Sequence, residues 1–258
     1  MTVEEMIAER TEKLEAIKDS SNAAVIAKGG SAADDLSGLP AAISSIPSGG
    51  GGAKEPYIEE TYNANGDLIG ANLVGYTAIR PYAFNNCIKL TLTSLPGSIT
   101  SIGGNAFQNC ARLALTSLPG GLTSIGPYAF YRCSKLALAS LPSGVTSIGN
   151  YAFASCANIT LTSLPSGLTR IEASTFDGCT NLALTSLPSS ITSIGANAFY
   201  KCTGLASITF QGKPGSIASS AFNGCTNLKT INVPWASGEV ANAPWGATNA
   251  TINYNYTG

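Results

Sequence analysis

Residues 133–156 read CSKLALASLPSGVTSIGNYAFASC, a stretch that begins and ends on a cysteine. All seven cysteines of the chain recur at this interval of 23 residues, and a phenylalanine stands three positions before each of them. The cysteine column comprises Cys87, Cys110, Cys133, Cys156, Cys179, Cys202 and Cys225, and the phenylalanine column comprises Phe84, Phe107, Phe130, Phe153, Phe176, Phe199 and Phe222. A fixed period of about 20 to 50 residues is typical of arrays whose units stack because none can bury its apolar face alone. The chain is therefore predicted to be a solenoid.

Each repeat divides into three short pieces. In residues 181–187, NLALTSL, two leucines lie two positions apart as in a half-buried strand, and Pro188 then ends the run because proline cannot donate to a ladder. The piece ITSIG is a second extended run, which most repeats close with a glycine suited to positive φ, namely Gly103, Gly126, Gly149 and Gly195. The last piece, AFxxC, is short enough for one helical turn. We expect a mainly β solenoid with parallel strands and one short helical turn per repeat.

The cysteine column allows three interpretations. Equivalent residues of stacked parallel strands lie about 4.8 Å apart, which is inside the Cα range for a disulfide, but their Cβ atoms stay farther apart than a disulfide prefers. Zinc needs ligands that converge tetrahedrally rather than lie in a column, and the chain has no histidine. The pattern favours free, buried thiols that pack beside the phenylalanines, with disulfides or metal binding as the alternatives.

The repeat follows a known sequence pattern. Residues 182–202 read LALTSLPSSITSIGANAFYKC, in which a leucine strand ends in proline and is followed by TSIG and then by AFxxC. Over residues 73–234 the chain resembles the bacterial leucine-rich repeats called BspA-like or treponemal type. The resemblance implies a leucine-rich-repeat solenoid at a bacterial surface, which mediates adhesion to host proteins or other cells and has no shared catalytic residues.

Two features depart from that pattern. Most repeats carry a leucine two positions after the first apolar residue of the strand, whereas the last two carry Ile208 and Ile231 at the third position, nearer the family norm. Glu172 and Thr175 replace the usual glycine and alanine in one repeat. We expect that repeat to be locally distorted.

Both ends of the repeat array are predicted to carry caps. Residues 57–76 contain Asn65 and Gly66, a strong signal for a hairpin turn between two extended runs, which would cover the open edge of the first repeat. The last segment breaks the repeat pattern and holds both tryptophans, Trp235 and Trp245. Its aromatic residues favour an irregular β cap over a carbohydrate-stacking site.

Residues 1–47 differ in kind from the repeats. Thr2 and Glu5 fit a capping box, and the heptad-like stripe that follows indicates an amphipathic helix or a short coiled coil able to self-associate. The region resembles N-terminal segments of tail-fibre-like and minor structural proteins of phages and prophages from gut Firmicutes. The expected divisions are 1–47 as a helical attachment or oligomerisation segment, 48–55 as a Gly-rich linker, and 56–258 as the solenoid, with an N-cap at 56–78, repeats at 79–234 and a C-cap at 235–258.

Composition limits the functional classes. Only 11% of residues are charged, and no apolar run reaches the roughly 18 residues that would cross a bilayer. The charged start of the chain is unlike a signal peptide. The lack of histidine removes the commonest general base and metal ligand, and nothing pairs a nucleophile with a base. We expect no enzymatic activity, no cofactor, no nucleic-acid partner and no membrane insertion.

Two surface columns are candidates for ligand binding. Lys89, Arg112 and Lys135 lie 23 residues apart, directly before the first strand of their repeats, and Arg132 is a further basic candidate. Stacked about 5 Å apart, they would present positive potential to an anionic partner such as a charged cell-wall polymer or glycan, or would form a merely solvated edge. The second column consists of strand threonines, namely Thr93, Thr116, Thr162 and Thr185. Such hydroxyl ladders bind glycans or ice in some proteins and are a plain polar surface in others.

Two functions follow from these features. The favoured one is a non-enzymatic recognition or adhesion module that binds a protein or glycan on a cell surface, as part of a phage tail or a bacterial surface structure. The alternative is a structural spacer or decoration protein of a virion or cell-surface assembly, without a ligand of its own. Either role predicts an extracellular or virion-associated protein.

Overall fold

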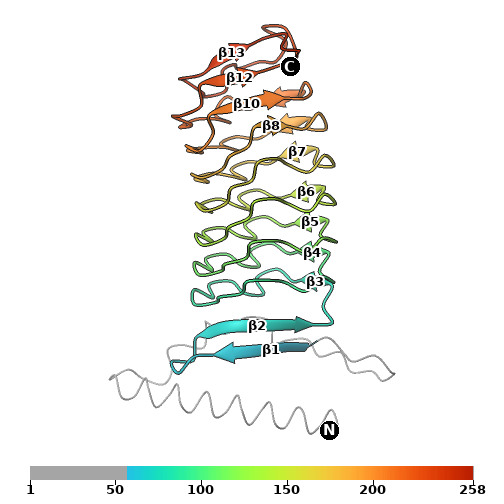
Figure 1. Ribbon diagram of the computed structural model, residues 1–258, viewed down its shortest axis with the longest axis vertical. Helices are drawn as coiled ribbons and strands as arrows, with labels where there is room; N and C mark the ends of the chain where they lie inside the picture. The colour runs from blue at the N-terminus through green and yellow to red at the C-terminus, as the bar shows by residue number, and fades with distance from the viewer. Residues whose placement is uncertain (1–56, 258) are drawn as a thin grey trace.

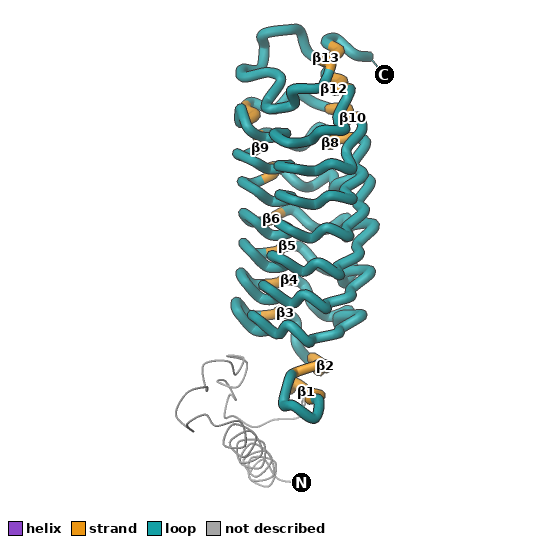
Figure 2. Tube along the Cα trace, turned by 90° about the vertical axis from the view of Figure 1, so that its left-hand side faces the viewer, coloured by secondary structure: helices purple, strands orange, loops and turns teal. Residues whose placement is uncertain are grey.

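The computed structural model describes residues 57–257. Within this range the chain winds into an elongated coil, in which each turn stacks on the next from the N-terminal hairpin to the C-terminal cap (Figures 1 and 2). The predicted mainly β solenoid is confirmed. The predicted helical segment at 1–47 and the linker at 48–55 lie outside the described residues.

The N-terminal cap is the predicted hairpin. Strand β1 (Tyr57–Tyr62) pairs antiparallel with β2 (Leu68–Val74). The side-chain oxygen of Asn63 accepts hydrogen bonds from two backbone N–H groups and closes the connection. Strand β2 also bonds to the first repeat, because the N–H of Thr91 donates to the carbonyl oxygen of Ile69 over 2.9 Å.

One side of the coil carries the strands of the ITSIG pieces. The first group, parallel and in register at 23 residues, consists of β3 (Ala78–Ile79), β4 (Ser101–Ile102), β5 (Ser124–Ile125) and β6 (Ser147–Ile148). The second group consists of β7 (Arg170–Ile171), β9 (Ser193–Ile194) and β11 (Ser216–Ile217). In each of these strands the isoleucine is at most 3% exposed. The isoleucine of each of these strands is therefore part of the core in every repeat.

The glycines after these strands allow the backbones of neighbouring repeats to approach closely, and they do not adopt positive φ. A Cβ atom on Gly126 would lie 2.5 Å from the backbone nitrogen of Gly104, and one on Gly149 would lie 2.5 Å from that of Pro127. The described glycines with positive φ do not include Gly103, Gly126, Gly149 or Gly195. The expectation of positive φ is wrong, because what Gly126 and Gly149 provide is room for the backbone of the preceding repeat.

The sheet is interrupted between β6 and β7. No pairing joins these two strands in the described part of the chain. In neighbouring repeats the residue after the isoleucine donates its N–H to the preceding repeat, as Gly149 does to Ile125 over 2.9 Å. The equivalent residue in the fifth repeat is Glu172, and within residues 57–257 its N–H makes no such bond to Ile148. The predicted distortion of this repeat is confirmed. A Cβ atom at this column does not by itself prevent the bond, because Ala218 at the equivalent position donates to Ile194 over 2.9 Å, so the interruption belongs to the repeat of the larger Glu172.

On the opposite side of the coil, regular strands occur only in the later repeats (Figure 2). They are β8 (Ser186–Leu187), β10 (Ser207–Phe210), β12 (Thr230–Asn232) and β13 (Thr251–Asn253), which form one parallel sheet. The expectation of a strand here in every repeat is wrong. Earlier repeats bury leucines at spacings of two and then three, as at Leu113, Leu115 and Leu118. The repeat of β8 has the same spacing, and its strand is confined to the two residues that pair with β10. In β10 the buried residues are two apart.

The AFxxC piece is a series of tight turns, and no helix occurs within residues 57–257. The N–H of Cys133 donates to the carbonyl oxygen of Phe130 over 3.0 Å, whereas that of Arg132 donates to Ala154 of the next repeat over 2.9 Å. Arg132 has a φ of 60°, as the third residue of a type II turn requires. The predicted helical turn is wrong, because a helix would use these donors internally and leave none to join the repeats.

The core is a continuous stack of phenylalanine rings. Neighbouring rings lie 5.0 to 5.7 Å apart between centroids and are parallel within 8°. At the C-terminal end, Trp235 and Trp245 are buried and pack against Phe210. These tryptophans seal the last repeat, which confirms the predicted cap.

Candidate ligand-binding surface

The cysteine column belongs to the packing of the fold. Six of the seven thiols are at most 4% exposed, and each donates its S–H to the carbonyl oxygen of the phenylalanine 26 residues earlier, over 2.9 to 3.1 Å. All seven cysteines are free. Burial raises the pKa of the buried thiols, to about 12 for Cys225. The column therefore holds neutral thiols that act as hydrogen-bond donors between repeats.

Cys87 differs because it stands at the N-terminal end of the column. Its side chain is only half-buried. Burial, with a smaller contribution from the negative charge of Glu60, raises its pKa to about 11. It is the most accessible of the seven thiols.

Two further findings concern residues 57–257. No group of three or more His, Cys, Asp or Glu side chains in this range could hold a metal ion. In the same range, no helix has both the length and the apolar character needed to cross a membrane.

The predicted basic residues belong to three successive repeats. Arg112, Arg132 and Lys135 are exposed, whereas Lys89 is half-buried. Lys135 lies in the turn of residues 133–136, directly after the turn that carries Arg132. We call these four residues the basic strip.

The basic strip lies in a part of the chain without acidic residues. Between Asp67 and Glu172 the sequence holds six Lys or Arg residues and no Asp or Glu. The ion pairs in the described part of the chain lie elsewhere, between Arg170 and Glu172 at 3.0 Å and between Lys213 and Glu239 at 2.7 Å. The positive charge of the strip is therefore not neutralised by an ion pair among the described residues.

The predicted threonine column is exposed and consists of Thr93, Thr116, Thr162 and Thr185. These threonines occupy the position that Ile208 and Ile231 fill in the last two repeats, where both isoleucines are 0% exposed. Three residues, two of them buried leucines, separate Arg112 from Thr116. The threonine column and the basic strip therefore run parallel along the coil without merging into one site.

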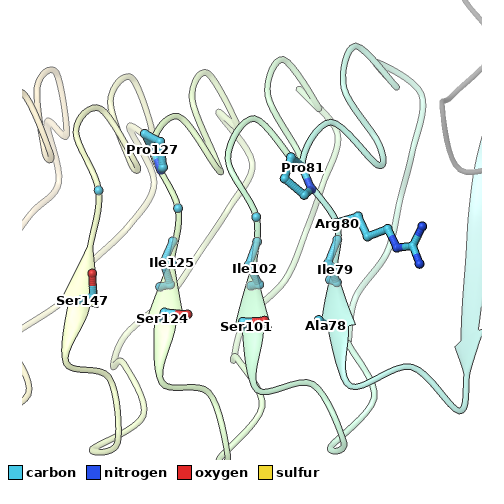
Figure 3. A pocket seen from close by; sticks show the side chains of 13 residues that line it. Ala78, Ile79, Arg80, Pro81, Ser101, Ile102, Ser124, Ile125, Pro127 and Ser147 are labelled. Atoms are coloured by element: carbon cyan, nitrogen blue, oxygen red, sulfur yellow. The ribbon is translucent and has the colours of Figure 1, made fainter.

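A shallow furrow of about 360 Å³ follows β3 to β6 (Figure 3). It is lined by the hydroxyl-bearing column of Ser101, Ser124 and Ser147, by the glycines that follow, and by Pro81 and Pro127. Figure 3 shows Arg80 at the N-terminal end of this row. The sequence does not reveal the furrow, because it arises from the close approach of backbones at the glycine column.

Sequence reasoning also missed a cluster of tyrosines beside the furrow. The rings of Tyr128 and Tyr151 stack with centroids 4.7 Å apart, and Tyr131 meets Tyr128 edge-on at 5.7 Å. Cζ of Arg132 lies 5.0 Å from the centre of the Tyr131 ring. The signal was present in the sequence, because Tyr82, Tyr128 and Tyr151 share one column of the 23-residue repeat.

The repeat geometry and the sequence match one family of bacterial repeats. The BspA type leucine rich repeat region matches residues 73–183 and 146–242, with six copies. The chain belongs to this family. No curated protein matches it. The matched BspA type residues include every cysteine and phenylalanine of the two core columns.

Three solved bacterial structures are similar to this BspA type chain in part. A leucine-rich repeat protein from T. pallidum is 26% identical over 68% of this chain and 81% of its own, with a TM-score of 0.40. A leucine rich cell surface protein from Faecalibacterium prausnitzii A2-165 is 21% identical over 80% of this chain and 96% of its own, with a TM-score of 0.25. The pneumococcal vaccine antigen PcpA is 17% identical over 75% of this chain and 61% of its own, with a TM-score of 0.39. The BspA type assignment rests on the repeat itself.

Proposed function

We propose that this BspA type solenoid is a non-enzymatic recognition module, which binds an anionic partner on a cell surface through the basic strip. The observation that carries the proposal is the exposed set of Arg112, Arg132 and Lys135 in a stretch without acidic residues. Repeats of this type commonly mediate adhesion or protein binding, and one similar bacterial protein is named a cell surface protein.

The spacing of the repeats concentrates positive charge in the basic strip. Successive repeats lie about 4.8 Å apart, and two unit charges at such a distance repel by about 1 kcal/mol in water. A polymer with closely spaced anionic groups relieves this repulsion when it binds. Because salt screens charges over about 10 Å at 0.1 M, such binding weakens as the salt concentration rises.

The chemistry of the other polar groups supports a non-enzymatic role. Burial raises the pKa of the core thiols, so they are held neutral at physiological pH and are poor nucleophiles. Glu172 is paired with Arg170 at 3.0 Å. Neither group is arranged as a nucleophile with a general base.

We further propose that residues 1–47 attach the solenoid to a phage tail or a bacterial surface structure and can self-associate. The support is the resemblance of this region to phage and prophage tail-associated proteins. The protein would then be virion-associated or extracellular. Tail and lysis genes beside this gene would support the phage assignment, whereas sortase or transporter genes would oppose it.

Binding of the full chain to polyglutamate at low and high salt tests the role of the basic strip. The wild type is expected to bind at low salt and to weaken about tenfold or more at 0.3 M salt. The variant with Lys89→Ala, Arg112→Ala and Lys135→Ala is expected to lose binding. The matched control with Arg170→Ala, Lys213→Ala and Lys229→Ala removes the same charge and is expected to keep it.

Two results would contradict the proposal. One is binding that is insensitive to salt, and the other is equal binding by the two triple variants. A chain that binds no ligand at all would favour the alternative function, a structural spacer or decoration protein.

A further inference from the structure

A row of tyrosines lies between the furrow and the basic strip in chain order. The rings of Tyr128 and Tyr151 stack at an interplanar angle of 7°. Tyr131 packs edge-on against Tyr128 and carries Arg132 over its ring. Tyr82 holds the position equivalent to Tyr128 two repeats earlier, and it is 53% exposed. We call Tyr82, Tyr128, Tyr131 and Tyr151 the tyrosine ridge.

Several residues of the tyrosine ridge, and Arg132 beside it, have positive φ angles, which glycine and asparagine adopt more easily than tyrosine or arginine. Tyr82, Tyr128 and Tyr151 have φ angles of 61°, 56° and 57°, and Arg132 has one of 60°. Bulky residues are uncommon at positive φ, where glycine and asparagine are favoured. Other repeats place asparagine, serine or glycine in the same two columns, except that Lys201 occupies the column of Arg132 and lies over the ring of Tyr200 in the same way. The turn would therefore form more easily without these aromatic and cationic side chains, which points to a role in what they contact.

The spacing of the ridge leaves an opening between two of its tyrosines. At a rise of about 4.8 Å per repeat, the Cα atoms of Tyr82 and Tyr128 lie about 10 Å apart, with Asn105 between them. A sugar ring in contact with an aromatic ring on each side needs about 7 to 8 Å, from contact distances of about 3.5 to 4 Å. A separation of about 10 Å is wide enough for one sugar ring above Asn105, in contact with one tyrosine ring at a time. The carboxamide of Asn105 is oriented by a hydrogen bond to Gln108.

The chemistry around the ridge fits a carbohydrate that carries carboxylates. The C–H faces of a sugar ring pack on tyrosine rings, and its hydroxyl groups bond to amide and hydroxyl side chains such as Asn105 and Ser124. Arg112 and Arg132 supply the charge that pairs with a carboxylate. The adjoining furrow is shallow and lined by serines, glycines and prolines, so it has no deep pocket for the aromatic anchor of a protein partner.

We propose that the tyrosine ridge and the basic strip together bind an acidic polysaccharide. Its sugar rings stack on Tyr82 and Tyr128, and its carboxylates pair with Arg112 and Arg132. The inference rests on the proposed function and goes further in requiring sugar rings as well as negative charge.

Binding of the full chain to three immobilised polymers tests the inference. Polygalacturonate has carboxylates on sugar rings, polyglutamate has carboxylates without sugar rings, and dextran has sugar rings without charge. The wild type is expected to bind polygalacturonate about tenfold more tightly than polyglutamate, and to bind dextran most weakly. Tyr82→Ala combined with Tyr128→Ala is expected to remove this preference and to leave polyglutamate binding unchanged.

The matched control is Tyr200→Ala combined with Tyr254→Ala, which removes two half-buried tyrosines outside the ridge and is expected to keep the preference. Tyr82→Ala alone guards against loss of folding, because this side chain is largely exposed, and it is expected to weaken polygalacturonate binding by itself. Equal binding of wild type to polygalacturonate and polyglutamate would overturn the inference and leave the anionic partner of the proposed function in place. Failure to bind either polyanion would overturn both.

Discussion

Alkaline pH is expected to unfold this protein through its cysteine column. Six thiols are buried and donate their S–H groups to carbonyl oxygens of the preceding repeat. Burial raises their pKa, to about 12 at Cys225, whereas a cysteine of the unfolded chain titrates near about 8.5. Because the folded pKa lies above the unfolded one, the thiols stabilise the fold fully below about pH 8.5 and lose that contribution as the pH rises toward the folded pKa.

The size of the effect follows from the number of protons involved. Above about pH 8.5 the native state retains seven protons that the unfolded chain releases, six on the buried thiols and one on Cys87, whose pKa is about 11. Each lowers the free energy of unfolding by about 1.4 kcal/mol per pH unit, so the seven thiols together lower it by about 10 kcal/mol per pH unit. Native proteins have free energies of unfolding of about 5 to 15 kcal/mol, so unfolding is expected at about pH 9 to 10.

Guanidinium unfolding of the reduced protein, repeated from about pH 7.5 to 10, measures this dependence. The Cys156→Ala variant is the comparison that isolates the thiols. It is expected to reduce the pH slope by about one seventh, because one of seven protons is gone, even though its cavity lowers stability at every pH. A free energy of unfolding that stays constant between pH 8 and 10, or an unchanged slope in the variant, would show that the buried thiols do not set the pH dependence.

Three further predictions concern the glycine column, the exposed thiol and the interrupted sheet. In thermal unfolding, Gly126→Ala should lower the free energy of unfolding by about 1 to 3 kcal/mol, because its Cβ atom would lie 2.5 Å from a backbone nitrogen. Gly120→Ala, whose Cβ atom would have nothing within 4 Å, should change it by less than about 0.5 kcal/mol. Equal effects of the two substitutions would contradict the close approach of backbones at Gly126. Brief treatment of the native protein with iodoacetamide should label Cys87 before the buried cysteines, as read by mass spectrometry, and uniform labelling would be inconsistent with the burial described. Glu172→Gly should let β7 pair with β6 and slow amide hydrogen exchange at residues 169–172, and unchanged exchange would show that this side chain does not cause the interruption.

The 23-residue period was sufficient to predict the stacked core, and the reason is geometric. In an in-register array each side chain meets its own copies, so a phenylalanine in every repeat must form a continuous stack, as Phe153 does with Phe130 and Phe176. The same regularity predicted free buried thiols and exposed Lys135. It failed for Lys89, which lies in the first repeat and is half-buried.

The remaining features depend on which acceptor each backbone N–H bonds to and on how closely neighbouring backbones approach, and the repeat period does not determine either. The N–H of Arg132 bonds to the next repeat instead of closing a helical turn. Gly126 is needed because a neighbouring backbone comes within 2.5 Å of its absent Cβ, a contact between residues far apart in the chain. The furrow arises from that same approach, so it could not be predicted from residue types. The tyrosine ridge could have been found, since its column of Tyr82, Tyr128 and Tyr151 is visible in the sequence.

Recognition of an anionic partner is assigned to the N-terminal repeats, which carry the basic strip and the tyrosine ridge. Amide hydrogen exchange of the full chain, with and without saturating polygalacturonate, measures where that partner binds. Slowed exchange is expected in peptides that cover residues 79–136, with little change in peptides that cover residues 182–257. Protection confined to the C-terminal repeats, or spread evenly over the coil, would contradict this assignment.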